Sequence, residues 1–163
     1  MTKDIVPIVD PSLKDPRIKT KFVEANGLRF EVDYCGTGPK LMLCLHGFPE
    51  HSFSWRYQLP MLADMGYTVW APNMRGYGLS SRPLRIADYR MEELIADVYG
   101  LYEASGCASL TILAHDWGAV IAWQYAMLKR SDLDHLIICN VPHPAAMGEL
   151  LERSLRTQRL SVC

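Results

Sequence analysis

The chain has 163 residues, of which 49% are apolar and 21% charged, a composition that fits a soluble globular domain. Its formal net charge of −1 gives no electrostatic case for a nucleic acid or a membrane as a partner. The first twenty residues lack the apolar run of a signal peptide or membrane anchor, and the five scattered cysteines form no CxxC pair. We therefore expect a cytoplasmic protein with free thiols.

The N-terminal region predicts an arm followed by a β-hairpin. Residues 1–20 are polar, contain three prolines and are interpreted as an extended arm. Two strands, Phe22–Ala25 and Leu28–Tyr34, are predicted on either side of Asn26-Gly27. This dipeptide is typical of a two-residue turn, because both positions of such a turn need φ > 0.

The next strand leads into a short motif. Leu41–Leu45 is a continuous apolar run, as expected of a strand that is buried on both faces. It ends in His46-Gly-Phe-Pro-Glu50, where Gly47 permits a turn and Pro49 stiffens it. A turn here would direct the backbone N–H of Phe48 into the crevice where open α/β sheets bind ligands. We expect His46 to bond the loop rather than to catalyse. Taken by itself, the His46–Pro49 tetrapeptide fits an ordinary turn equally well.

The middle of the chain alternates helix, strand, loop and helix. A helical segment is predicted at about residues 57–65 and a strand at Tyr67–Ala71. The glycine-containing loop that follows carries Arg75, which either pairs with groups near the site or lies in solvent. Met91–Ala104 predicts an amphipathic helix that ends at Gly106. Its apolar face is formed by Leu94, Val98, Leu101 and Tyr102, and its acidic residues Glu92, Glu93 and Asp97 gather towards the N-terminal half.

The most informative stretch runs from Leu110 to Val120. An apolar strand is followed by Ala114-His-Asp-Trp-Gly118 and then by a nearly all-apolar helical stretch, 119–129. A strand, a sharp turn and a helix are the setting of a nucleophile elbow, whose neighbouring residues must be small. Ala114 and Gly118 meet that need, which places Asp116 at the apex. The alternative interpretation is that Asp116 caps the next helix. An ionised carboxylate needs no base to attack carbon, so an apical aspartate suits epoxides and alkyl halides.

The last predicted strand is Leu136–Val141, followed by His143 between two prolines. We do not expect His143 to be a catalytic base, since its position on a proline-bounded loop favours a positional role. Residues 145–163 contain apolar side chains at helical spacing. Alternating strands and helices predict a mostly parallel α/β sheet with helices on both faces, and the candidate site residues all follow strand ends.

Four motifs, in this order, resemble those of α/β-hydrolase-fold epoxide hydrolases: residues 46–50, 75–78, 114–118 and 140–144. The resemblance covers residues 22–147. It implies an N-terminal antiparallel hairpin before a partial hydrolase core at 21–144, with the start of a cap helix at 145–163. It also implies that Asp116 forms an alkyl-enzyme ester with a small epoxide, which water then hydrolyses, and that the reaction needs neither cofactor nor metal.

The resemblance assigns the remaining site residues as well. The backbone N–H groups of Phe48 and Trp117 match the oxyanion hole, and the same two side chains match pocket-lining positions. The supporting motif comprises His46, Gly47, Pro49, His115 and Gly118.

The sequence departs from the family pattern in two ways. Asn73 stands where the family often has Asp, which is expected to alter a loop bond. In addition, the last tyrosine is Tyr125 and the last histidine is His143, so neither the two cap tyrosines nor the water-activating histidine has a match. The resemblance therefore implies a sheet truncated after about its sixth strand, and a chain that does not turn over alone. A haloalkane dehalogenase-type hydrolase and a non-catalytic interaction fragment, pairing through an open strand edge, remain as alternatives. Oligomeric state is left open.

Overall fold

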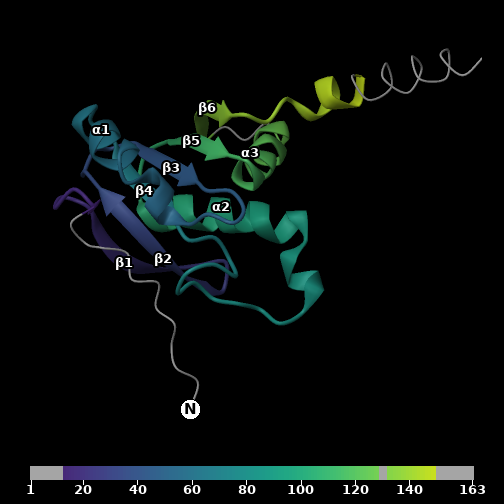
Figure 1. Cartoon of the computed structure of the whole chain (residues 1–163), viewed down its shortest axis with the longest axis horizontal. Coiled ribbons are helices and arrows are strands. Elements are labelled where there is room, and N and C mark those ends of the chain that lie inside the picture. Colours follow the sequence, from purple (N-terminus) through teal and green to yellow (C-terminus); the bar gives the residue numbers. More distant parts are fainter. Residues whose placement is uncertain (1–12, 129–131, 150–163) are drawn as a thin grey trace, which may run out of the picture.

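A computed structural model describes residues 13–128 and 132–149, and six strands within these ranges form a single sheet in the order β1-β2-β4-β3-β5-β6 (Figure 1). The strands are β1 (Lys19–Ala25), β2 (Leu28–Cys35), β3 (Leu41–Leu45), β4 (Thr68–Pro72), β5 (Leu110–His115) and β6 (Leu133–Cys139). The α-helices are α1 (Gln58–Asp64), α2 (Met91–Ser105) and α3 (Trp117–Met127), and the short 3₁₀ helices are η2 (Ser52–Trp55) and η3 (Ile86–Tyr89).

The sheet is mostly parallel, with an antiparallel N-terminal part, as predicted. β3, β4, β5 and β6 run parallel, whereas β2 pairs antiparallel with both β1 and β4. The hairpin turn is confirmed, because Asn26 (φ 47°) and Gly27 (φ 68°) both have positive φ. β1 begins at Lys19, three residues before the predicted start, since Lys19–Lys21 continue the pairing with β2.

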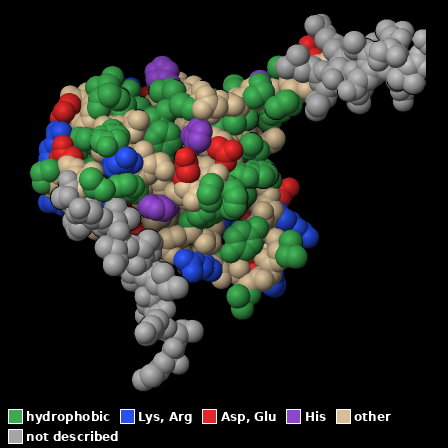
Figure 2. Space-filling view, in the orientation of Figure 1, with side chains coloured by type: hydrophobic (Ala, Val, Ile, Leu, Met, Phe, Trp, Pro, Cys, Tyr) green, Lys and Arg blue, Asp and Glu red, His purple; other side chains and the backbone are tan. Residues whose placement is uncertain are grey.

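Helices cover both faces of the sheet. Side chains of β3 alternate between two cores: Leu41, Leu43 and Leu45 pack with α2 and α3, whereas Met42 and Cys44 pack with α1 and Trp55. Because both faces are covered, β3 reads as an uninterrupted apolar run. The helix predicted at residues 91–104 is confirmed as α2, and Gly106 ends it with φ 66°. Figure 2 shows apolar side chains over α1, where Tyr57, Met61 and Met65 are exposed.

The predicted boundaries of β6 and α3 are wrong as well. β6 was predicted at Leu136–Val141 but lies at Leu133–Cys139, because the polar Asp134 at its start accepts hydrogen bonds from Lys40 and Ser109. α3 begins at Trp117 rather than at residue 119, directly after the apex of the turn. Within the described residues β6 pairs with β5 alone, and Ile137 is 43% exposed there.

Parts of three predictions lie outside the described residues: the arm at 1–12, the end of the α3 segment at 129, and 150–163 of the C-terminal segment. Residues 144–149 are helical. No helix in the ranges 13–128 and 132–149 has the length and apolar character needed to cross a bilayer.

Candidate active site

The turn between β5 and α3 has the geometry of a nucleophile elbow. Asp116 has φ 51° and ψ −122°, a backbone conformation that residues other than glycine rarely adopt. Gly118, two residues after Asp116, must lack a side chain, since a β-carbon there would lie 2.5 Å from the carbonyl oxygen of Leu45. Ala114 and Ala119 are fully buried on either side. The expectation of small neighbours around an apical Asp116 is therefore confirmed.

The loop after β3 delivers a backbone donor to this carboxylate. The N–H of Phe48 donates a hydrogen bond to Oδ1 of Asp116 at 2.8 Å. The approach depends on Gly47, because a β-carbon there would lie 2.4 Å from the β-carbon of Asp116. The Phe48–Pro49 peptide bond is cis. Asp116 thus faces the β3 loop, and its side chain makes no capping hydrogen bond to α3.

Two backbone donors set the charge of the site. The backbone N–H of Phe48, followed by that of Trp117, lowers the pKa of the Asp116 carboxyl below its ordinary value, because both stabilise the ionised form. Asp116 is therefore a carboxylate at neutral pH. Of its two oxygens, Oδ1 is the one that accepts the hydrogen bond from the Phe48 amide.

His46 joins the loop after β3 to the loop after β4. Its Nε2 accepts a hydrogen bond from the N–H of Met74 at 3.1 Å, and its Nδ1 lies 2.9 Å from the carbonyl oxygen of Gly47. Since a backbone N–H can only donate, Nε2 carries no hydrogen and Nδ1 donates to Gly47. We call these two hydrogen bonds the His46 clamp. It links the loop after β3 to the loop after β4 and requires a neutral ring.

Burial keeps that ring neutral. His46 is fully buried, and burial lowers its pKa, opposed in part by the hydrogen bond to Gly47. Among nearby charged groups, His51 also lowers the pKa of His46, whereas Glu50 raises it.

His115 links the loop after β3 to the end of β5. Its Nδ1 lies 3.2 Å from Oε2 of Glu50, and each side chain is about one-third exposed (32% and 35%). The pair ties the end of the β3 loop to the residue before the elbow. Glu50 was not singled out from the sequence, because no local pattern marks which residue of the loop faces His115.

The two aromatic residues expected to line the pocket flank the carboxylate with open surfaces. Phe48 is 66% exposed and Trp117 is 55% exposed. Exposed aromatic side chains next to an ionised carboxylate in the sequence or bonded to it provide an apolar surface close to the charge.

Arg75 lies in the interior, so the interpretation as a solvated arginine is wrong. Its guanidinium pairs with both carboxylate oxygens of Asp97 at 2.6 Å and also donates to the carbonyl oxygens of Asp88 and Glu93. Asn26 donates a further hydrogen bond to Asp97 at 2.9 Å. The burial of Asp97 was not predicted from the sequence, where Asp97 counted only as one of the acidic residues in the N-terminal half of the helix. This network braces the loop after β4 and does not include Asp116.

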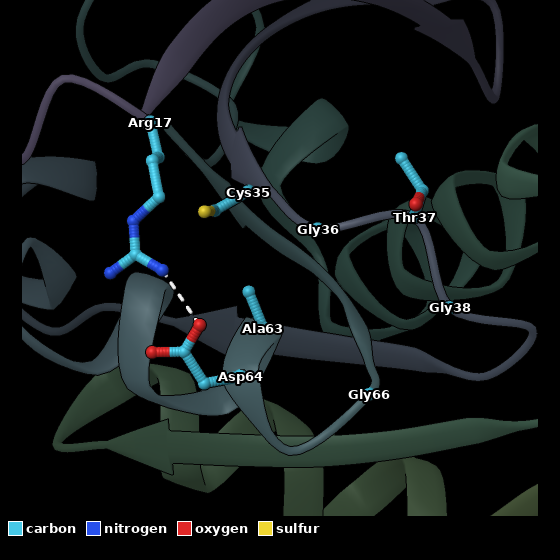
Figure 3. Close-up of a pocket in the computed structure, with 8 residues that line it drawn as sticks. All are labelled: Arg17, Cys35, Gly36, Thr37, Gly38, Ala63, Asp64 and Gly66. Carbon is cyan, nitrogen blue, oxygen red and sulfur yellow. Dashed lines mark hydrogen bonds and ion pairs between the residues drawn. The ribbon is translucent and has the colours of Figure 1, made fainter.

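A cavity of about 400 Å³ lies at the opposite end of the central strands, before β3 and β4 begin (Figure 3). It is lined by Gly36, Gly38, Gly66 and the Arg17–Asp64 ion pair, together with Cys35, Thr37 and Ala63. These residues precede β3 and β4, whereas the candidate site follows β3 and β5. The cavity is therefore separate from the candidate site at Asp116. No cluster of three or more His, Cys, Asp or Glu side chains suited to a metal ion occurs among residues 13–128 and 132–149.

Comparison with known proteins agrees with this geometry. Residues 40–160 match the family model described as alpha/beta hydrolase fold. The chain belongs to that family. It is 44% identical over 127 residues to "Epoxide hydrolase 3" of Xenopus tropicalis, covering 76% of this chain and 34% of the relative. "Epoxide hydrolase A" of Mycobacterium tuberculosis is 42% identical over 123 residues, covering 75% and 38%. The chain is thus an epoxide hydrolase homologue that spans between a third and a half of the length of these relatives.

Solved structures of epoxide hydrolases match the fold of this chain. The crystal structure of Epoxide Hydrolase A from Mycobacterium thermoresistibile matches with a TM-score of 0.74 and 40% identity, over 77% of this chain and 40% of that one. An epoxide hydrolase of Vigna radiata matches with a TM-score of 0.74 and 36% identity, over 77% and 41%. The resemblance identified from the four motifs is therefore confirmed at the level of family and fold.

Proposed function

We propose that the chain carries the nucleophilic half of a hydrolase that opens epoxides to diols. The observation that carries the proposal is the 2.8 Å hydrogen bond from the Phe48 N–H to Asp116 Oδ1 at the apex of the elbow. The epoxide hydrolase homologues support the substrate class. The free thiols of Cys35, Cys44, Cys107 and Cys139 agree with a cytoplasmic location.

The first step is an SN2 displacement at an epoxide carbon. A lone pair of Asp116 Oδ2 forms the new C–O bond while the ring C–O bond breaks, and the ring oxygen takes a proton from water. In this scheme water supplies that proton and leaves as hydroxide. The product is an ester on Asp116, and Oδ1 becomes its carbonyl oxygen.

The second step is hydrolysis of that ester. Water adds to the carbonyl carbon, and negative charge develops on Oδ1, which already accepts a hydrogen bond from the Phe48 amide. Collapse of the intermediate releases the diol and restores the carboxylate. This step needs a base to take a proton from water. We propose that the chain by itself forms the ester but does not release it in repeated cycles.

Intact-mass measurement tests the proposal. The 163-residue chain is incubated with a terminal epoxide, and we expect one adduct per chain, mapped by peptide analysis to Asp116, with no more than one equivalent of diol. Asp116→Asn is the matched control, since it keeps the shape of the side chain and removes the nucleophile. An adduct that persists in Asp116→Asn, or the absence of any adduct, contradicts the assignment.

Repeated turnover by the isolated chain would instead contradict the single-cycle expectation. A parallel incubation with an alkyl halide addresses the dehalogenase alternative. Halide release with no epoxide adduct would favour that alternative.

A further inference from the structure

The loop after β4 holds Tyr77 in a fixed position. Tyr77 lies between Gly76 (φ 86°) and Gly78 (φ 52°). Its N–H donates to the carbonyl oxygen of Met74 at 2.9 Å, and its carbonyl oxygen accepts from the N–H of Ser80 at 3.0 Å. Gly78 cannot carry a side chain, since a β-carbon there would lie 2.3 Å from Nδ2 of Asn73. The backbone around Tyr77 is therefore rigid, and the side chain has a defined direction.

That direction is towards the His46 clamp. The rings of Tyr77 and His46 are 4.7 Å apart between centroids, at an interplanar angle of 73°. Such an edge-on pair is a favourable arrangement of aromatic rings. His46 is fully buried, whereas Tyr77, whose ring packs against it, is half-buried. Burial raises the pKa of the Tyr77 hydroxyl, and the negative charge of Asp116 raises it further, which agrees with a location beside the nucleophile.

From these contacts we propose that Tyr77 is a positioning residue for the nucleophile. Its ring keeps His46 neutral and in the tautomer with hydrogen on Nδ1, and the clamp in turn holds Gly47 so that the Phe48 amide stays on Asp116. The contribution comes from the ring, not from the hydroxyl. The inference rests on the proposed function only for its kinetic readout.

Each link of this chain of contacts is short. His46 binds the carbonyl oxygen of Gly47, the residue before Phe48, and Gly47 touches Asp116. If the ring of Tyr77 is removed, water reaches His46, the penalty against its protonated form falls, and its pKa rises. A proton on Nε2 would face the N–H of Met74. Because two donors cannot form a hydrogen bond with each other, the clamp would open.

NMR of the histidine side chains in the full 163-residue chain tests the inference without any substrate. Wild type, Tyr77→Phe and Tyr77→Ala are titrated from pH 8 to pH 4.5, with the His46 tautomer and pKa as the readout. We expect wild type and Tyr77→Phe to share the Nδ1–H tautomer and a depressed His46 pKa. In Tyr77→Ala we expect the His46 pKa to move up towards that of an exposed histidine. Tyr57→Ala is the control, since Tyr57 is 67% exposed and stacks on Arg56 outside the clamp.

The rate of Asp116 alkylation by an epoxide is the second readout. We expect Tyr77→Ala to react about tenfold more slowly than wild type, with the acid limb of its pH profile displaced to higher pH, and Tyr77→Phe to restore both. Tyr77→Val, which leaves most of the volume of the ring open to water, replaces Tyr77→Ala if the smaller variant does not fold, and the same changes are expected.

Three results would overturn the inference. The first is an unchanged His46 tautomer and pKa in folded Tyr77→Ala or Tyr77→Val. The second is a loss in Tyr77→Phe as large as in Tyr77→Ala, and the third is an equal effect of Tyr57→Ala. Absence of alkylation in every variant, wild type included, would refute the proposed function, while the NMR titration would still decide the role of Tyr77.

Discussion

Gly47 and Asp116 are in such close contact that a β-carbon on Gly47 would lie 2.6 Å from the Oδ1 atom of Asp116. The absence of a side chain at residue 47 is therefore a condition for the Phe48 amide to reach the carboxylate. This contact gives the first of four predictions.

Gly47→Ala should displace the β3 loop from the carboxylate. We expect alkylation of Asp116 to slow by about 100-fold, because a displacement of roughly 1 Å at a reacting centre has that effect. Overpacking should also lower the free energy of unfolding by about 1–3 kcal/mol. Mass spectrometry and urea denaturation measure the two effects. Gly148→Ala is the control, since a β-carbon at Gly148 meets no atom within 4 Å; equal behaviour of the two variants would contradict the prediction.

The acid stability of the chain should depend on His46. Because the folded-state pKa of His46 is lowered, the unfolded chain binds more protons than the folded chain as pH falls below about 6.5. Stability from this group is present above that pH and is lost as pH falls towards the lowered pKa, with a slope of at most about 1.4 kcal/mol per pH unit. His46→Gln, which retains an acceptor for Met74 but does not titrate there, should flatten this part of the profile. Urea denaturation at a series of pH values measures it, and identical profiles would count against the clamp.

Asn73→Asp, which restores the residue common in the family, should destabilise this chain. Asn73 is buried, and its Nδ2 donates to Oε2 of Glu31 at 2.6 Å. An aspartate would place a second carboxylate at that distance, and we expect a loss of about 1–3 kcal/mol at pH 7. The loss should shrink at acidic pH, where one of the two carboxyl groups is protonated. In the double variant Glu31→Gln/Asn73→Asp, stability measured by urea denaturation should recover; no recovery would show that repulsion is not the cause.

Asp97→Ala should be more damaging than removal of the whole ion pair. The variant leaves the Arg75 guanidinium buried without its carboxylate, which typically costs about 3–5 kcal/mol. The double variant Arg75→Met/Asp97→Leu removes both charges and should lose less. Thermal and urea denaturation of the three proteins measure the difference. If the single variant is as stable as the double, the pair does not brace the loop after β4.

Features encoded locally could be predicted from the sequence. The Asn26-Gly27 turn, the continuous apolar run of β3 and the small residues around Asp116 each follow from steric needs within a few residues of chain. The parallel sheet followed from the alternation of such elements. The first and last strands were misplaced because Lys19 and Asp134 are polar residues that join strands through pairing and side-chain bonds from distant parts of the chain.

Contacts between loops could not be predicted in the same way. Asp97 pairs with a guanidinium 22 residues away, and Glu50 meets His115 across 65 residues. In both cases the residue type is as suited to solvent as to the interior, so composition and spacing carry no signal. The role of Arg75 was left open for that reason, and the fold decided it.

The amide of Phe48 and the oxygen it holds are 68 residues apart in the chain. A chain in which β3 and β5 have not yet come together therefore has only an ordinary surface aspartate at position 116. Sensitivity to an electrophile would arise at the moment the two strands dock, so a pulse of labelling reagent during refolding would time the assembly of the central sheet.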